Sequence, residues 1–152
     1  IEGYLSFLKD LREQVKNLLD GLPQEALDWQ PIPEKGDLVT NSIGALCVHL
    51  AGSENFWMKE VIGRQPIQRD REAEFVSKGV KKEELNTRLD GSARSAQEAL
   101  SSLDLAKLDE TRRYRDRTIT VQWAILHVIE HYAIHIGHMQ LTRQLWLFQH
   151  GK

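Results

Sequence analysis

The stretch HVIEHYAIHIGHM, residues 127–139, contains four of the six histidines in the chain. On a helix that turns about 100° per residue, His127, His131, His135 and His138 fall within an arc of roughly 80°. Apolar residues share this arc, so we expect the histidine stripe to point into the protein and not into solvent. Two histidines four residues apart can direct ring nitrogens at one ion, an arrangement typical of metal sites in helical bundles. The alternative is a set of core histidines satisfied by hydrogen bonds.

A third ligand must come from another helix, and His49 is the remaining histidine in an expected helical interior, since His150 lies at the solvated tail. Cys47 is about 200° around the helix from His49, so both cannot face one ion. We expect Cys47 to be a small buried core residue. Glu54 and Glu130 are the carboxylates nearest in sequence, and their angular positions favour outer-shell or surface groups over ligands.

Four segments carry the three-and-four apolar spacing of core-facing helices: about 1–22, 40–63, 81–103 and 121–148. The letters TNS at residues 40–42 offer an N-cap for the second helix, and Thr118 or Thr120 offers one for the last. Residues 118–121 look extended, but no segment has the length of a sheet strand. The sequence therefore predicts an all-α four-helix bundle with long interhelical connections.

The two long connections differ in composition. Residues 23–40 contain three prolines and an aromatic anchor, Trp29, which we expect to lie against the bundle. Residues 64–79 are polar and irregular by pattern, and Pro66 excludes a continuous helix there. These connections must carry the chain between the helices that hold the histidines.

The length of 152 residues predicts a single domain, 1–152, and the numbering leaves open whether native residues precede Ile1. A lone cysteine fits a reducing cytoplasm better than an oxidising compartment. No stretch approaches the roughly 20 apolar residues of a membrane helix, so we expect no membrane partner. A net charge of −2 gives no electrostatic reason to expect nucleic acid.

Two segments, NSIGALCVHLAGSENFWMKEVIG and TVQWAILHVIEHYAIHIGHMQL, resemble the DinB-like superfamily (DinB/YfiT-like four-helix metalloproteins). This superfamily includes bacillithiol transferases and, more distantly, mycothiol-dependent maleylpyruvate isomerase. The resemblance covers essentially the whole chain, including LPQEALDWQPIP in the first connection. In the family, one histidine of the second helix and an HxxxH pair of the fourth bind a divalent ion. The resemblance thus implies His49, His131 and His135 as metal ligands.

One part of the family motif differs, because the frequent HxGQ stands here as HIGH and His138 replaces glutamine. We expect His127, one turn before the pair, to be an outer-shell or substrate-facing group, with a satisfied core residue as the alternative. His138 is a second outer-shell candidate. Gly137 costs about 1 kcal/mol relative to alanine inside a helix, which suggests close approach of another helix or a loop.

Three imidazoles leave one to three coordination positions open, which is typical of catalytic sites. Imidazole suits zinc or nickel best, and also iron or manganese. The ion would deprotonate a small thiol or lower the pKa of bound water towards about 7. The resemblance favours an enzyme that transfers a low-molecular-weight thiol to small electrophiles. The alternatives are a hydrolase that uses metal-bound hydroxide and a non-catalytic, metal-containing binding module.

The run RRYRDR at residues 112–117 is the one dense basic patch of the sequence. We read it as a solvated loop, with the alternative that one or two of its arginines hold a substrate carboxylate over the pocket. Phe56, Trp57 and Trp146 are expected in the core, whereas Trp123 is the best candidate for substrate stacking. The apolar end QLWLF, residues 144–148, together with the habit of the family predicts a homodimer.

Overall fold

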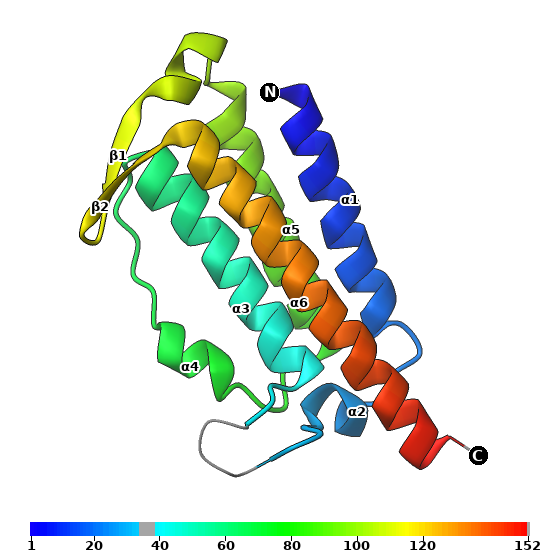
Figure 1. Ribbon diagram of the computed structural model, residues 1–152. Coiled ribbons are helices and arrows are strands. Elements are labelled where there is room, and N and C mark those ends of the chain that lie inside the picture. The colour runs from blue at the N-terminus through cyan, green and yellow to red at the C-terminus, as the bar shows by residue number, and fades with distance from the viewer. Residues whose placement is uncertain (34–38, 152) are drawn as a thin grey trace.

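The computed structural model describes residues 1–33 and 39–151 and contains four long helical segments (Figure 1). They are α1 (Glu2–Leu19), α3 (Ile43–Asn55) with its π-helical continuation η2 (Phe56–Ile62), α5 (Lys82–Ser101) and α6 (Val121–His150). Three shorter helical pieces lie in the connections: α2 (Gln24–Asp28), α4 (Arg71–Phe75) and η3 (Leu105–Asp109). The predicted all-α four-helix bundle is confirmed.

Side-chain caps fix the starts of the two helices that carry the histidines. Ser42 Oγ accepts a hydrogen bond from the Ala45 amide at the start of α3. Thr120 Oγ1 accepts one from the Trp123 amide at the start of α6. Each cap satisfies an amide that has no partner within its helix, and each is among the caps predicted from sequence.

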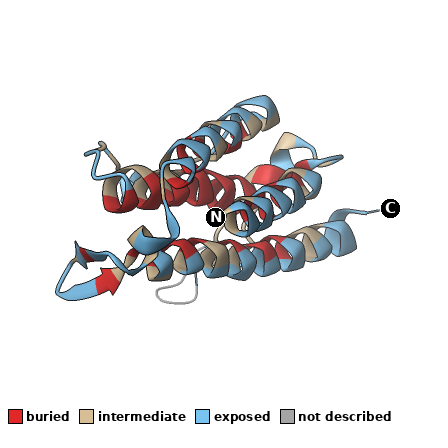
Figure 2. Cartoon of the chain, turned by 90° about the horizontal axis from the view of Figure 1, so that it is seen from above, coloured by how far each residue is buried: buried red, intermediate tan, exposed pale blue. Residues whose placement is uncertain are grey.

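The hydrophobic core lies between the four long helices, and α3 is its central element. Almost every residue of α3 is buried, and Figure 2 shows one helix red along most of its length while its neighbours are red on one side. A helix that is apolar on all sides needs neighbours on all sides. Its position in the middle of the bundle therefore explains its composition, and it brings His49 close to α6.

A short β-hairpin precedes α6 and was only half predicted. Strands β1 (Thr111–Tyr114) and β2 (Arg117–Thr120) pair antiparallel, with Tyr114 opposite Arg117. The extended reading of residues 118–121 identified the second strand but not its partner, whose residues TRRY carry no apolar alternation. The hairpin lies at the side of the bundle, next to η2 (Figure 1).

The first long connection packs on the bundle through Trp29, as predicted. Its ring lies 5.7 Å from that of Trp146 and 5.9 Å from that of His150, measured between ring centroids. Part of this connection, residues 34–38, lies outside the described residues. The second connection contains the short helix α4, which the irregular pattern of residues 64–79 did not predict. Among the described helices, none combines the length and apolar character needed to cross a membrane.

Candidate metal centre and active-site cavity

Three histidines from two helices meet at one point of the bundle. His49 Nε2 on α3 lies 3.0 Å from His131 Nε2 on α6, and His135 Nε2 lies 3.1 Å from the same atom. One ligand atom from each residue lies within 4.8 Å of the other two, so the three could hold a metal ion. His49 is buried, whereas His131 and His135 are half-buried.

The electrostatics of the cluster keep the α6 rings neutral. Burial, reinforced by the neighbouring histidines, lowers the pKa of His131 to about 3. Burial and the nearby His49 lower the pKa of His135 to about 4. Neutral imidazole is the form that binds metals, so both rings are available as ligands at neutral pH.

The spacing of these nitrogens fits a shared ion. Two imidazole nitrogens at a Zn–N distance of about 2.0–2.1 Å and a tetrahedral angle would lie about 3.3 Å apart. The observed 3.0 and 3.1 Å separations are close to this value. Within residues 1–33 and 39–151, three histidine nitrogens and no further protein ligand meet at this point, which matches the donor set of catalytic sites better than that of structural sites.

A carboxylate that the sequence did not reveal orients His49. The Nδ1 atom of His49 donates a hydrogen bond of 2.9 Å to Glu74 Oε2, which leaves Nε2 as the ligating nitrogen. Arg69 in turn donates to both oxygens of Glu74, at 2.7 and 2.8 Å. Burial alone would raise the pKa of Glu74, but hydrogen bonds from Arg69 and His49 outweigh it and lower that pKa.

Gly52 makes room for this carboxylate. A Cβ atom at position 52 would overlap the Oε1 atom of Glu74. Gly52 lies on α3 three residues after His49, and its exchange for a larger residue would displace the carboxylate. We expected close approach of another helix or a loop at Gly137 instead, and that expectation is wrong, because no atom of another segment lies within 4 Å of the place that a Cβ would take there.

From the sequence we expected the histidine stripe to point into the protein. In the structure it lies at the edge of the core. Tyr132, Ile136 and Met139 face the core, so the histidines between them are half-buried or exposed. His138 is exposed, and its Nδ1 atom lies 3.4 Å from that of His135. His127 is half-buried, and its Nδ1 atom lies 3.8 Å from the exposed carboxylate of Glu130.

Cys47 and Glu54 have no part in the cluster. Cys47 is fully buried, and burial raises the pKa of its thiol to about 12. Glu54 is also fully buried, where it accepts hydrogen bonds from Arg12 and Tyr132. The expectation that Glu54 is an outer-shell or surface group is wrong, because it belongs to an ion pair inside the core.

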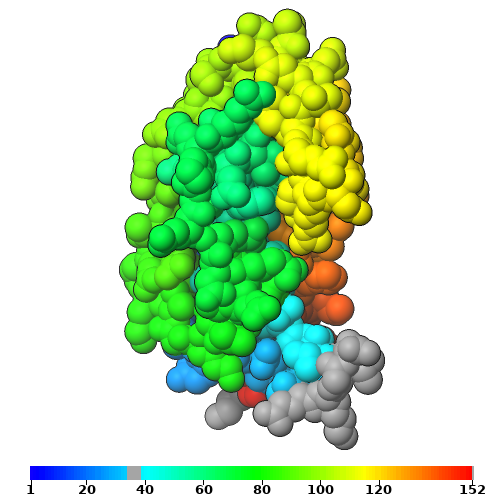
Figure 3. Space-filling view, turned by 90° about the vertical axis from the view of Figure 1, so that its left-hand side faces the viewer, coloured from blue at the N-terminus to red at the C-terminus, as the bar shows by residue number. Residues whose placement is uncertain are grey.

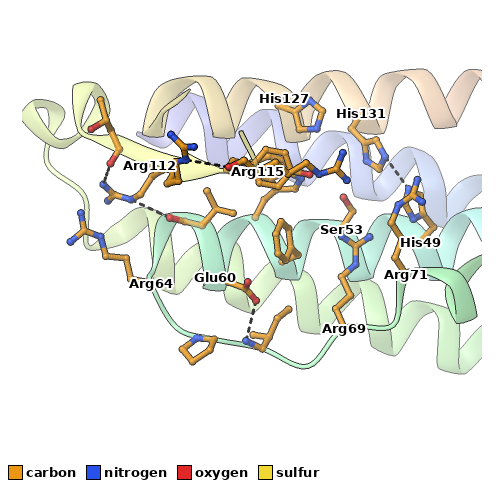
Figure 4. A pocket seen from close by; sticks show the side chains of 18 residues that line it. His49, Ser53, Glu60, Arg64, Arg69, Arg71, Arg112, Arg115, His127 and His131 are labelled. Carbon is orange, nitrogen blue, oxygen red and sulfur yellow. Dashed lines mark hydrogen bonds between the residues drawn. The ribbon is translucent and has the colours of Figure 1, made fainter. Parts of the chain in front are cut away.

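A cavity of about 1060 Å³ opens beside His49 and His131. Its walls include the connection after η2 and the β1–β2 hairpin, two segments that lie on the same face of the molecule (Figure 3). Figure 4 shows His127, His131 and His49 along this cavity, with arginines of both segments nearby. The volume is at the upper end of the range typical of small-molecule sites.

Aromatic rings form part of the cavity wall. Phe56, Trp57 and Tyr114 line it, and Trp57 is 3% exposed. The ring of His127 stacks on that of Trp123, with 5.0 Å between centroids and 8° between planes. Trp123 therefore supports a cavity histidine, while the rings that line the cavity come from η2 and the hairpin.

Comparison with known proteins identifies the family. A family model described as Mycothiol-S-transferase matches residues 4–146, a span that contains all three clustered histidines and the cavity. The chain belongs to this family. The family is DinB-like, which confirms the resemblance carried by the two histidine segments.

Other comparisons of this mycothiol-S-transferase family member bear on the fold alone. A conserved protein from Enterococcus faecalis has a similar solved structure, with a TM-score of 0.74, 17% identity and 95% of each chain covered. No curated protein matches the sequence. Family membership points to thiol transfer as the class of reaction, and the cavity geometry supplies the candidate residues.

Proposed function

We propose that the chain is a metal-dependent thiol S-transferase, with His49, His131 and His135 as ligands of one divalent ion. One observation carries the proposal: three imidazole nitrogens converge beside a cavity large enough for two small reactants, in a chain of the Mycothiol-S-transferase family. The donor set favours zinc or nickel, and it also suits iron or manganese. When bound, such an ion lowers the pKa of a thiol or water beside it and so supplies a nucleophile at neutral pH.

The nucleophilic sulfur must come from a substrate. Cys47 is buried in the core, and burial raises the pKa of its thiol to about 12, so the chain supplies no reactive thiol of its own. In the proposed reaction the small thiol loses its proton, and its sulfur forms a bond to an electrophilic carbon. Either a leaving group departs with its electron pair, or an unsaturated acceptor takes up the proton.

The residues of the chain have distinct tasks in this scheme. Glu74 holds His49 through Nδ1, and Arg69 fixes Glu74 with two hydrogen bonds. His127 lines the cavity one turn before His131, and we assign it as the imidazole that takes up the thiol proton. His138 is exposed, and we assign it an outer role beside His135.

The test combines metal analysis with a thiol panel. Metal-reconstituted protein is incubated with a chromogenic electrophile and mycothiol, bacillithiol, glutathione or coenzyme A, beside ester, amide and lactone substrates without thiol. We expect thiol-dependent turnover, about one metal ion per chain, and loss of both in His131→Ala. The control His150→Ala changes a histidine at the exposed end of α6 and should retain both.

Each other outcome decides against the proposal. Turnover without thiol, with a rate that rises through a pKa near 7, would assign hydrolysis by activated water. A metal content that survives replacement of all three histidines would remove the ligand assignment. Metal binding without turnover in either arm would favour a non-catalytic binding module.

We further propose a homodimer in a reducing cytoplasm. Leu147 and Phe148 lie next to each other near the end of α6 and are 44% and 86% exposed, so both apolar side chains are open to contact with a second chain. Trp146, by contrast, packs against Trp29 and His150 of its own chain. Light scattering at micromolar concentration should give twice the chain mass of 17.5 kDa, and Phe148→Glu should give the monomer. A wild-type monomer would contradict the dimer.

A further inference from the structure

Arginine is concentrated around the cavity. Six of the eleven arginines in the sequence line it: Arg64, Arg69, Arg71, Arg112, Arg113 and Arg115. Glu60 is the one carboxylate among the lining residues, and its Oε2 atom accepts a hydrogen bond from the Ile67 amide. The net charge of the chain is −2, so this local excess of positive charge does not follow from overall composition.

Some of these arginines are held by the protein itself. Arg69 is bound to Glu74 as described above, and Arg112 donates to the Val61 carbonyl and to Glu110. Such arginines hold the cavity walls together.

Three others keep their charge available. Within residues 1–33 and 39–151, no carboxylate forms an ion pair with Arg71, Arg113 or Arg115. Arg71 and Arg115 lie over the rings of Phe75 and Tyr114, at 5.0 and 5.3 Å from the ring centroids. Arg113 Nε donates a hydrogen bond of 3.2 Å to the Arg115 carbonyl, which leaves the terminal nitrogens of Arg113 for a ligand beside the guanidinium groups of Arg71 and Arg115.

The backbone at two of the lining arginines is in the left-handed region. Arg64 and Arg115 have φ angles of 56° and 54°, and they are the non-glycine residues with positive φ in the described chain. Glycine adopts this left-handed region without the steric cost that an arginine Cβ brings. Both positions instead carry arginine, and both line the same cavity. Arg115 lies in the two-residue turn of the hairpin and Arg64 follows the end of η2, so these turns hold both arginine backbones in fixed positions at the rim of the cavity.

We propose that the substrate of this cavity carries a carboxylate or phosphate group, which Arg71, Arg113 and Arg115 bind beside the histidines. The planar guanidinium fork matches both groups through paired, charge-assisted hydrogen bonds. The arginines come from the connection after η2 and from the hairpin, so the anion joins the two walls of the cavity. This inference rests on the proposed thiol transfer, and it assigns a negative charge to a substrate of that reaction.

Calorimetry on the full chain at low ionic strength tests the inference. The probes are succinate, inorganic phosphate and uncharged dimethyl succinate. We expect one or both anions to bind and the ester not to bind, with affinity about tenfold weaker in Arg71→Gln and in Arg115→Gln. Arg117→Gln is the matched control, because Arg117 lies on the same hairpin but over Trp123, outside the cavity lining, and should bind as the wild type does.

Arg115→Gly separates binding from folding. Glycine suits a φ angle of 54°, so the Tm of this variant should equal or exceed that of the wild type while anion affinity falls about tenfold. A purely structural arginine would give a lower Tm instead. Measured in this way, lost affinity cannot be attributed to unfolding.

The same measurement in His131→Ala, which lacks a proposed ligand, distinguishes this inference from the proposed function. If His131→Ala still binds the anion through its arginines and the wild type shows no thiol turnover, the anion site is upheld and the transferase is rejected. Four results would each overturn the inference. Succinate and its ester could bind equally, or neither anion could bind detectably. Arg71→Gln and Arg115→Gln could keep the wild-type affinity, or anion binding could follow metal content alone. The tighter of the two anions identifies the group.

Discussion

The Oε2 atom of Glu74 lies 2.9 Å from Nδ1 of His49, so a carboxylate on α4 fixes the ring whose opposite nitrogen faces the histidines of α6. Such hydrogen bonds set the tautomer and orientation of a ligating histidine and raise its basicity. The short helix α4 thus takes part in the site without contributing a ligand.

Glu74→Gln should weaken metal affinity about 10–100-fold, because the amide cannot offer the same charged acceptor to His49 Nδ1. Competition with a chromogenic chelator measures the affinity. Glu72→Gln, in the same helix but exposed, is the control and should bind as the wild type does. Equal affinities in all three proteins would show that Glu74 serves only its ion pair with Arg69.

Gly52→Ala tests the same contact from the other side. Alanine is favoured over glycine by about 1 kcal/mol inside a helix, so this change would ordinarily stabilise α3. Here its Cβ would overlap the Glu74 carboxylate, and we expect weaker metal binding without loss of helical circular dichroism. Gly137→Ala is the control, since open space surrounds that position and metal affinity should not change. Unchanged metal affinity in Gly52→Ala would mean that Glu74 can move aside without affecting His49.

These contacts indicate why the sequence revealed one part of the site and not another. The histidines were recognisable because His131 and His135 recur at the period of a long helix and His49 lies within an apolar one. Glu74 follows His49 by 25 residues and lies in a five-residue helix, too short to show a period. A glycine inside a helix, as at position 52, indicates close approach of another group. The sequence does not show that this group is Glu74, because only the fold brings α4 next to α3.

The helical periodicity of the sequence also did not predict how far the histidine stripe is buried. Four histidines share one face, but that face borders the core, because Tyr132 and Met139 occupy the direction of the bundle centre. Angular position on a helix predicts which residues share a face, and neighbouring helices decide how far that face is covered. His127 and His131 are left partly uncovered because the cavity lies beside them.

Chelator treatment should lower stability without unfolding the chain, because the core is formed by all four helices independently of the histidines. With free ion at 100 times its Kd, binding contributes about 2.7 kcal/mol. Its removal should lower the Tm by about 5–10 °C. Differential scanning calorimetry measures this shift, and His131→Ala should show none on chelation. Loss of helical circular dichroism on chelation would instead make the ion essential for folding.

Cys47 should be unreactive in the folded protein. Burial raises the pKa of its thiol to about 12, so at pH 8 roughly one molecule in ten thousand carries the thiolate, and buried packing blocks access to it. We expect no reaction with a disulfide reagent in native buffer and one equivalent in denaturant. The reaction rate in native buffer should increase only as pH approaches 12. Rapid native labelling at pH 8 would contradict the requirement that the nucleophilic sulfur come from a substrate.

Breaking the buried Arg12–Glu54 pair should destabilise the bundle and leave the metal site intact. Arg12→Met leaves the fully buried Glu54 carboxylate without its charged partner, a change that costs about 3–5 kcal/mol in comparable proteins. Urea denaturation measures the loss. The double variant Arg12→Met/Glu54→Leu removes both charges and should recover most of it, because no buried charge is then uncompensated. Metal content should stay at the wild-type value in both variants, and its loss would mean that this pair also holds α3 in place for His49.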